Sequence, residues 1–160
     1  MAIYFYSKTD AYSWLSNFSS HGLELDGQHW PTVEHYFQAA KFFGTDDAWA
    51  EMIRQAATPS AAKTMGRSKQ HPLRPDWERV KDDVMRLAVR AKFETHADLR
   101  AELLGTGDEE LVENSPRDYY WGCGRDWSGK KRAREDPDGG AGRAVGGLFS
   151  FQPPCRRRSG

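Results

Sequence analysis

Apolar residues recur at helical spacing through much of the first two thirds of the chain. The clearest stripe follows Pro31 and consists of Val33, Tyr36, Phe37 and Ala40. Thr32 stands in front of this stripe as an N-cap residue, and Gly44 follows it as a stop signal. The pattern therefore predicts a helix that starts beside Pro31 and ends near Gly44.

Four more helices are indicated by the same kind of pattern. Residues 46–56 form one short helix, and Thr58-Pro59 begins another that ends at Gly66, because proline fits the first helical position. The run from Thr95 to Asp98 resembles a capping box and opens a last helix that stops at Gly105. Between these, Asp76 caps a longer helix with apolar residues at Trp77, Val80, Val84, Leu87, Ala88 and Ala91.

Two short segments near the N-terminus favour β structure. Residues 3–6 are rich in β-forming side chains, and residues 21–30 form an extended stretch that turns at Asp26-Gly27, a strong turn dipeptide. No internal repeat is visible. The expected fold class is mainly α with a small N-terminal β element, in a single domain.

Length and composition fit a cytoplasmic enzyme or binding domain. The chain has 160 residues, and 23 basic residues balance 23 acidic ones, so no overall positive field points to nucleic acid. The first residues lack the pattern of a signal peptide, and no apolar run is long enough to span a bilayer. Cys123 and Cys155 lack the spacing of a zinc site or a disulfide framework, so we expect no metal and no other cofactor.

The predicted helix after Pro31 also carries three polar side chains on one face. At about 100° per residue, Gln38 and Lys41 both lie within roughly 40° of Glu34 around the helix axis. In glycosidic cleavage a carboxyl group moves protons and stabilises a developing oxocarbenium ion, and an amine can condense with a sugar aldehyde. Solvated charges on an exposed helix face would show the same spacing, so both interpretations stay open.

Other residues with useful chemistry each have a structural alternative. Trp77 is either a stacking platform for a base or a core residue, and Arg67 either meets a phosphate or lies in a solvated basic loop. His35 fits a hydrogen-bonded histidine near a helix N-terminus better than a proton shuttle. Asp118 precedes Trp121-Gly-Cys-Gly, which indicates either a tight turn against a small ligand or a purely structural turn.

Together, several of these segments resemble the YbiA-like, or NADAR, family. They occur in the family's order between residue 3 and about residue 130, and the long run around Glu34 is specific. The matching runs are Phe5-Tyr-Ser, Leu15-Ser-Asn17-Phe18, Trp30-Pro-Thr-Val-Glu34-His-Tyr-Phe-Gln38-Ala-Ala-Lys41-Phe, Met65-Gly-Arg67, Pro72-Leu-Arg-Pro-Asp-Trp77, Met85 to Phe93 and Asp118-Tyr-Tyr-Trp121-Gly.

The resemblance implies a mainly helical fold and hydrolysis of N-glycosidic bonds. Family members are associated with early riboflavin-pathway intermediates that carry a ribosylamine phosphate, and others with removal of ADP-ribose from guanine bases. Carried over by motif, Glu34 is the leading acid/base, Lys41 the candidate amine and Asp118 a second acidic group. The residues expected to contact or position the substrate are Asn17, Gln38, Arg67, Trp77 and Trp121.

The family-like domain is expected to end at Gly129, because residues 130–160 depart from the family. The family normally ends with the helix pattern Gly-Lys-Asn-x-Leu-Gly-x-x-Leu-Met-x-Val-Arg, whereas Gly129-Lys130 is followed here by a run rich in glycine and arginine. A one-base shift within codons chosen for residues 131–142 restores that helix. We therefore predict a disordered tail and hypothesise a single-nucleotide insertion near codon 131.

Three functions fit the sequence. The first is an N-glycosidase for phosphoribosylamine-type intermediates of riboflavin biosynthesis, a small-molecule role without a membrane or nucleic-acid partner. The second is an ADP-ribosyl-guanine glycohydrolase acting on ADP-ribosylated nucleic acid, and the balanced charge counts only mildly against it. The third is a non-catalytic module that binds NAD or ADP-ribose. The presence of both Glu34 and Lys41 argues against this module, although the tail argues for lost function.

Overall fold

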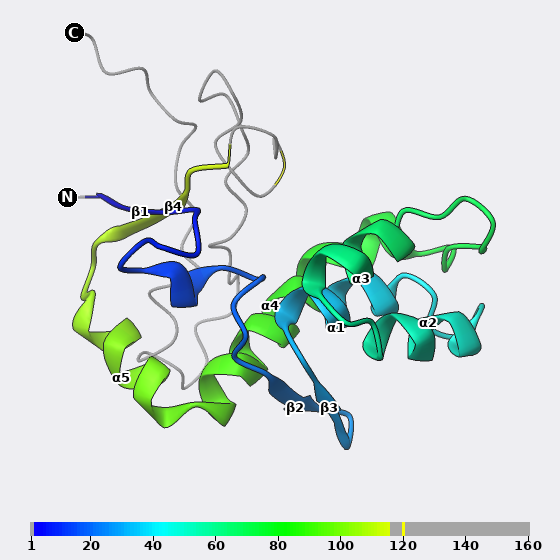
Figure 1. Cartoon of the computed structure of the whole chain (residues 1–160), viewed down its shortest axis with the longest axis horizontal. Coiled ribbons are helices and arrows are strands. Elements are labelled where there is room, and N and C mark those ends of the chain that lie inside the picture. Colours follow the sequence, from blue (N-terminus) through cyan, green and yellow to red (C-terminus); the bar gives the residue numbers. More distant parts are fainter. Residues whose placement is uncertain (1, 116–119, 121–160) are drawn as a thin grey trace, which may run out of the picture. The chain divides into compact units, whose positions relative to one another are not determined.

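The computed structural model describes residues 2–115 and residue 120, and these form two compact units (Figure 1). One unit combines the described residues up to 16 with those from 98 onward, and the other holds residues 17–97. The described residues contain five α-helices, a short 3-10 helix and four short strands. The prediction of a mainly helical fold with a small β element is therefore confirmed. The predicted domain end at Gly129 and the predicted tail, residues 130–160, lie outside the described residues.

The first unit is held together by a two-stranded parallel sheet. Strand β1 (Ala2–Phe5) pairs with strand β4 (Glu110–Glu113), with Ile3 opposite Leu111. The 3-10 helix η1 (Ser13–Leu15) follows β1, and helix α5 (Ala97–Gly105) precedes β4. The expected strand at residues 3–6 is present one residue earlier, whereas β4 was not predicted. Its partner lies at the other end of the described chain, so no local pattern marks the pairing.

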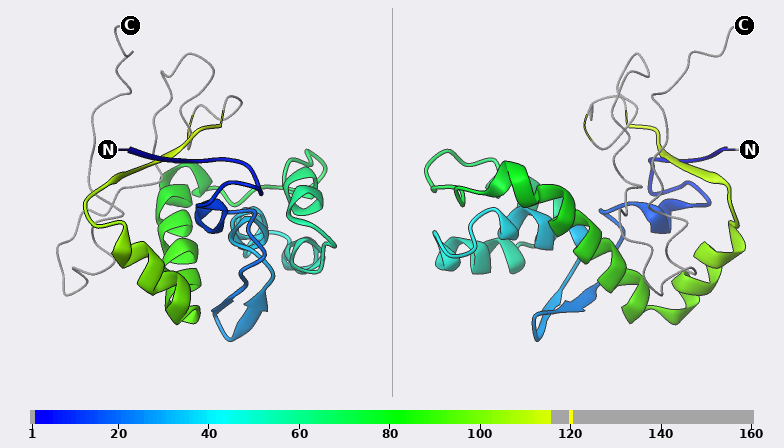
Figure 2. Two further views of the ribbon diagram at one scale, coloured as in Figure 1. Left: turned by 60° about the vertical axis from the view of Figure 1, so that its left-hand side comes forward. Right: turned by 180° about the vertical axis from the view of Figure 1, so that it is seen from behind.

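The second unit is built around helix α1 (Val33–Ala40). Helices α2 (Asp47–Arg54), α3 (Pro59–Met65) and α4 (Trp77–Thr95) all contact α1, and the two views in Figure 2 show α1 to α3 grouped together. All eight residues of α1 are buried. A helix buried on every side must satisfy its polar groups inside the protein.

A β-hairpin leads into α1. Strands β2 (Leu23–Leu25) and β3 (Gln28–Trp30) are antiparallel, and the turn residues Asp26 and Gly27 have φ of 55° and 74°. Positive φ at both positions fits the predicted tight hairpin turn. The Tyr36 hydroxyl donates to the Asp26 carboxylate at 3.3 Å, which ties the turn to α1. Burial, and then the Asp26 charge, raises the pKa of the Tyr36 hydroxyl.

Three helices begin with a side chain that accepts a backbone N–H, as was predicted for Thr32 and Thr58. Each of these bonds satisfies one N–H that has no acceptor within its own helix. The predicted end of the first helix is too late by about one turn, because α1 already ends at Ala40 and Gly44, with φ of 77°, lies beyond it. The caps are Thr32 for His35 N at 3.2 Å, Asp46 for Trp49 N at 3.0 Å and Thr58 for Ala61 N at 3.1 Å.

Two of the expected caps are wrong. Asp76 precedes α4, but its carboxylate accepts from the Arg74 guanidinium at 2.6 and 3.0 Å and caps no N–H. A bond between two charged groups outcompetes the neutral N–H. Thr95 does not open α5, because it is the last residue of α4 and its hydroxyl donates to the carbonyl one turn earlier at 2.7 Å.

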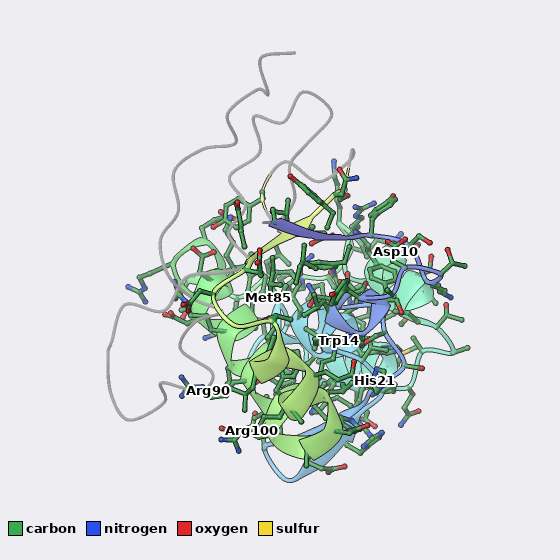
Figure 3. All side chains as sticks on the ribbon, turned by 90° about the vertical axis from the view of Figure 1, so that its left-hand side faces the viewer. Asp10, Trp14, His21, Met85, Arg90 and Arg100 are labelled. Atoms are coloured by element: carbon green, nitrogen blue, oxygen red, sulfur yellow. The ribbon has the colours of Figure 1, made fainter. Side chains whose placement is uncertain are left out.

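The buried face of α4 also differs from the predicted stripe. Leu87 is 45% exposed, while Lys92 is only 1% exposed and donates to the Ser19 hydroxyl at 2.7 Å. Arg90, on the same helix, points away from the ribbon in Figure 3. Although α4 has 19 residues, none of the helices in the described part of the chain is long and apolar enough to cross a membrane.

The Thr32 cap gives a first testable prediction. Thr32→Ala removes the acceptor for the His35 amide and the partner of the His35 ring, so we expect it to lower the free energy of unfolding by about 2 kcal/mol. Thr32→Ser keeps both bonds and should cost much less. Thr58→Ala, at an exposed cap, should cost about 1 kcal/mol. Urea denaturation followed by circular dichroism measures all three, and equal midpoints for Thr32→Ala and Thr32→Ser would contradict the prediction.

Candidate functional site

Polar side chains from α1 form the centre of the candidate site. Glu34 is 5% exposed and Gln38 is 4% exposed, so the reading of this helix face as ordinary solvated charge is wrong for both. Burying a carboxylate or an amide costs free energy unless it is hydrogen-bonded. The partners of these groups therefore define what the site can do.

Glu34 is held by a side chain from its own helix and by a neighbouring loop. The Gln38 amide donates from Nε2 to Glu34 Oε1 at 2.7 Å, across one helical turn. The Glu34 backbone N–H donates to the Asn17 carbonyl at 3.1 Å. The Asn17 side chain in turn lies 3.5 Å from the sulfur of Met85 on α4, labelled in Figure 3. The carboxylate is therefore held by Gln38, while the loop before the hairpin joins the start of α1 to α4.

Gly66, directly after α3, packs tightly against Gln38. A Cβ added to Gly66 would lie 2.0 Å from Gln38 Oε1 and 2.8 Å from Gln38 Cβ. Its φ is −67°, so glycine is needed here for space and not for backbone conformation. Within the described residues Gln38 Oε1 is buried without a hydrogen-bond partner, and it faces Gly66. The hydrogen bond to the Glu34 carboxylate orients the amide, and Gly66 leaves the space that its oxygen occupies.

Lys41 follows α1 directly and is half-buried. Its Nζ donates to the Gly66 carbonyl at 3.1 Å and lies 5.9 Å from the Phe37 ring centroid and 6.0 Å from that of Trp77. Burial lowers the pKa of the Lys41 amine to about 8, with Arg67 and Lys63 adding to this effect and Glu34 opposing it. Part of the Lys41 population is therefore an uncharged amine near pH 8, which is the nucleophilic form.

Two further predicted site residues, Trp77 and Arg67, lie near Lys41, one aromatic and the other charged. Trp77 is 6% exposed and packs against Phe37 with ring centroids 5.1 Å apart, so the core interpretation describes most of its surface. Arg67 is exposed, and its charge acts on Lys41. Six of the eight predicted site residues thus come together within residues 17–97, namely Asn17, Glu34, Gln38, Lys41, Arg67 and Trp77.

The two remaining predicted site residues cannot be placed in this group. Asp118, the expected second acidic group, and Trp121, an expected substrate contact, lie outside the described residues. Their assignments rest on the family motif and stay predictions.

His35 is a structural residue, as the sequence indicated. Its Nε2 lies 3.0 Å from the Ala56 carbonyl, which can only accept, so Nε2 carries the proton. Its Nδ1 then accepts from the Thr32 hydroxyl at 2.8 Å. Burial lowers the pKa of His35, which favours this neutral form with both ring nitrogens satisfied.

Two residues near the site were missed in the sequence. Gly66 was read as a stop signal for α3, although its close approach to Gln38 is the stronger constraint. Lys63 was not singled out, yet its Nζ lies 5.3 Å from the Phe18 ring centroid and its charge acts on Lys41. Lys63 and Arg67 are four residues apart, and this spacing could have indicated that both side chains lie near the C-terminal end of α3.

Comparison with known proteins finds a matching family model and similar proteins that share one kind of name. The family model of the NADAR domain matches residues 4–146. The N-glycosidase Npun_R5314 of Nostoc punctiforme is 52% identical over 130 residues, which are 81% of this chain and 83% of that protein. The N-glycosidase YbiA of Escherichia coli K12 is 51% identical over 130 residues, covering 81% of this chain and 80% of that protein.

A solved structure and a plant protein extend the comparison. The solution structure of E. coli YbiA has 50% sequence identity and a TM-score of 0.75, and it covers 82% of this chain and 77% of that one. The expected mainly helical, single-domain fold thus has a solved counterpart. The riboflavin biosynthesis protein PYRR, chloroplastic, of Zea mays is 41% identical over 140 residues, which are 79% of this chain and 22% of that protein.

The close contact at Gly66 generates a second prediction. The methyl group of Gly66→Ala would overlap the Gln38 side chain, so we expect α1 and α3 to shift and the free energy of unfolding to fall by about 1–3 kcal/mol. Gly105→Ala is the matched control, because Gly105 ends α5 with no atom within 4 Å of an added Cβ.

Urea denaturation of the two variants distinguishes a packing effect from a general effect of replacing glycine. Gly105→Ala should be neutral or slightly stabilising. A Gly66→Ala variant as stable as Gly105→Ala would show that the contact with Gln38 relaxes without cost.

Proposed function

The chain belongs to the NADAR family, and we propose that it acts on phosphoribosylamine-type intermediates of riboflavin biosynthesis. It is an enzyme, a hydrolase of N-glycosyl bonds, as relatives with 51–52% identity over most of their length are named N-glycosidases. The riboflavin assignment is supported by the related maize protein, which is named for riboflavin biosynthesis. The cytoplasmic location expected from the sequence is part of this proposal.

The observation that carries the proposal is the buried, hydrogen-bonded Glu34 carboxyl group beside the Lys41 amine. Breaking an N-glycosidic bond leaves positive charge on the ribose ring and requires a proton on the departing nitrogen. We assign both tasks to Glu34. Water adds hydroxide to C1 and its remaining proton replaces the one that left with the nitrogen, so the carboxyl group is restored.

Lys41 offers a second route for capturing C1. An uncharged amine can attack C1 as the nitrogen departs, or condense with the aldehyde of the opened ring, and water then releases the sugar. The pKa of about 8 makes such an amine available near neutral pH. Whether water or Lys41 captures C1 is the choice that experiment decides.

The remaining assignments concern substrate placement. We propose that Asn17 and Gln38 position Glu34, that Arg67 binds a charged part of the substrate, and that Trp77 supports the Lys41 end of the site. Their support is the set of contacts to Glu34 and Lys41 described above. Asp118 as a second acidic group and Trp121 as a substrate contact complete the proposal on the family motif alone.

The substrate class is tested by comparing the products that the chain releases from the substrates of the different proposed functions. The purified full chain is incubated with a phosphorylated ribosylamine intermediate and, separately, with an oligonucleotide that carries ADP-ribose on guanine. We expect free ribose 5-phosphate from the first and little ADP-ribose from the second. Faster release of ADP-ribose would transfer the assignment to nucleic acid repair, and tight binding without any product would indicate a binding module.

Replacement of the carboxyl group gives the third prediction. Glu34→Gln keeps the size of the side chain but cannot exchange a proton, so we expect kcat to fall by about 10²- to 10⁴-fold. Glu78→Gln, on the exposed first turn of α4, is the matched control and should keep normal turnover. Circular dichroism verifies that both variants are folded, and comparable turnover by Glu34→Gln and the unmodified chain would refute the role of Glu34.

The role of Lys41 gives the fourth prediction, which concerns pH. If the amine captures C1, the rate rises with pH as Lys41 loses its proton and levels off above about 8. Lys41→Arg keeps the positive charge but stays protonated, so both the activity and this rise should be lost. Sodium borohydride should also trap an adduct on the unmodified chain alone. An active Lys41→Arg variant without any trapped adduct would instead assign the capture step to water.

A further inference from the structure

Three cationic side chains gather where α3 ends. Lys63 lies in the last turn of α3, Arg67 follows Gly66, and Lys41 reaches the same place through its bond of 3.1 Å to the Gly66 carbonyl. The charges of Arg67 and Lys63 both act on Lys41 and lower its pKa. Like charges held close together repel one another, so this grouping costs free energy in the unliganded protein.

In the part of the chain that the structure describes, these three cations, Lys41, Lys63 and Arg67, take part in no ion pair with an acidic side chain. Glu34 is the carboxylate whose charge acts on Lys41, and it already accepts a hydrogen bond from Gln38. Among the described residues, the groups whose charges act on Lys41 are one carboxylate and two cations, so the described charge around this amine is positive on balance.

Lys63 packs against an aromatic ring. It is half-buried, and its Nζ lies 5.3 Å from the centroid of the Phe18 ring, within the range of a cation–π contact. Phe18 follows Asn17, whose carbonyl accepts from the backbone N–H of Glu34. The contact therefore places the Lys63 ammonium beside the loop that is bonded to Glu34.

We propose that Lys63, together with Arg67, binds the phosphate group of the substrate and selects phosphorylated ribosylamines over unphosphorylated ones. The inference rests on the proposed function and adds to it the residue that determines specificity. A phosphate monoester carries about −1.5 to −2 charge at neutral pH, which is opposite in sign to the cations gathered here. Arg67 contributes a planar fork of donors and Lys63 a compact charge, two groups that suit phosphate oxygens.

The same phosphate chemistry occurs in the pyrophosphate of ADP-ribose. A monoester concentrates its charge on one group, which suits cations gathered at one helix end, whereas a pyrophosphate spreads the same charge over two. We therefore assign the site to the monoester, and ribose 5-phosphate and ADP-ribose serve as the two probes that distinguish the sources.

The test is isothermal titration of the full chain with ribose 5-phosphate, ribose and ADP-ribose. We expect ribose 5-phosphate to bind at least about tenfold more tightly than ribose. Lys63→Ala should lower the affinity for ribose 5-phosphate by about tenfold and leave the affinity for ribose unchanged. Lys63→Arg keeps the charge and should retain most of the affinity. Lys69→Ala is the matched control, because Lys69 is an exposed lysine of the following loop. This variant should bind ribose 5-phosphate with normal affinity.

Steady-state kinetics distinguish phosphate binding by Lys63 from a purely structural role. Lys63→Ala should raise KM for the phosphorylated ribosylamine by about tenfold with kcat within a few fold of normal, because the phosphate lies away from the bond that breaks. Removal of the Lys63 charge also raises the pKa of Lys41, so any rise of rate near pH 8 should move to higher pH.

Each outcome separates this inference from the proposed function. Unchanged affinity of Lys63→Ala for ribose 5-phosphate, or equal binding of ribose and ribose 5-phosphate, overturns the phosphate assignment without affecting the hydrolysis result. A larger loss for ADP-ribose than for ribose 5-phosphate overturns the choice of a monoester. Lys63-dependent binding of ribose 5-phosphate with no hydrolysis of any ribosylamine supports the site and overturns the proposed function alone.

Discussion

The burial of α1 on every side is the constraint on which the rest of the second unit depends. An eight-residue helix with no exposed face must find partners for Glu34, His35 and Gln38 inside the protein. These partners come from different segments: the Asn17 loop, the Thr32 cap and the carbonyl of Ala56. The polar groups therefore fix α1 against its neighbours more specifically than apolar packing alone would.

The helices and the hairpin were predictable because their signals are local. Thr32, Asp46 and Thr58 can reach only a backbone N–H a few residues ahead, and Asp26-Gly27 adopts the positive φ that its composition favours. The strand β4 had no such signal, because its four residues pair with the opposite end of the described chain. Asp76 shows how a local rule fails when a charged partner such as Arg74 competes for the same carboxylate.

In the candidate site, too, the features set by local sequence were predictable and those set by packing were not. The placement of Glu34, Gln38 and Lys41 on one side of a helix is a property of spacing, so it could be predicted. Their burial is a property of how α3 and α4 pack on α1, so the same spacing was equally consistent with a solvated face. Gly66 and Lys63 depend on that packing as well, since their effects arise from contacts with Gln38 and Phe18 on other segments.

A comparison of two lysines shows which feature marks a catalytic candidate. Burial lowers the pKa of Lys92 to about 7 and that of Lys41 to about 8, so a shifted pKa does not distinguish them. Lys92 is 1% exposed and donates to Ser19, which joins α4 to the loop before the hairpin. Lys41 is only half-buried, and its amine lies between aromatic rings and the charges at the end of α3. A nucleophile needs both an uncharged form and a path for its substrate, and of these two lysines Lys41 alone meets both requirements.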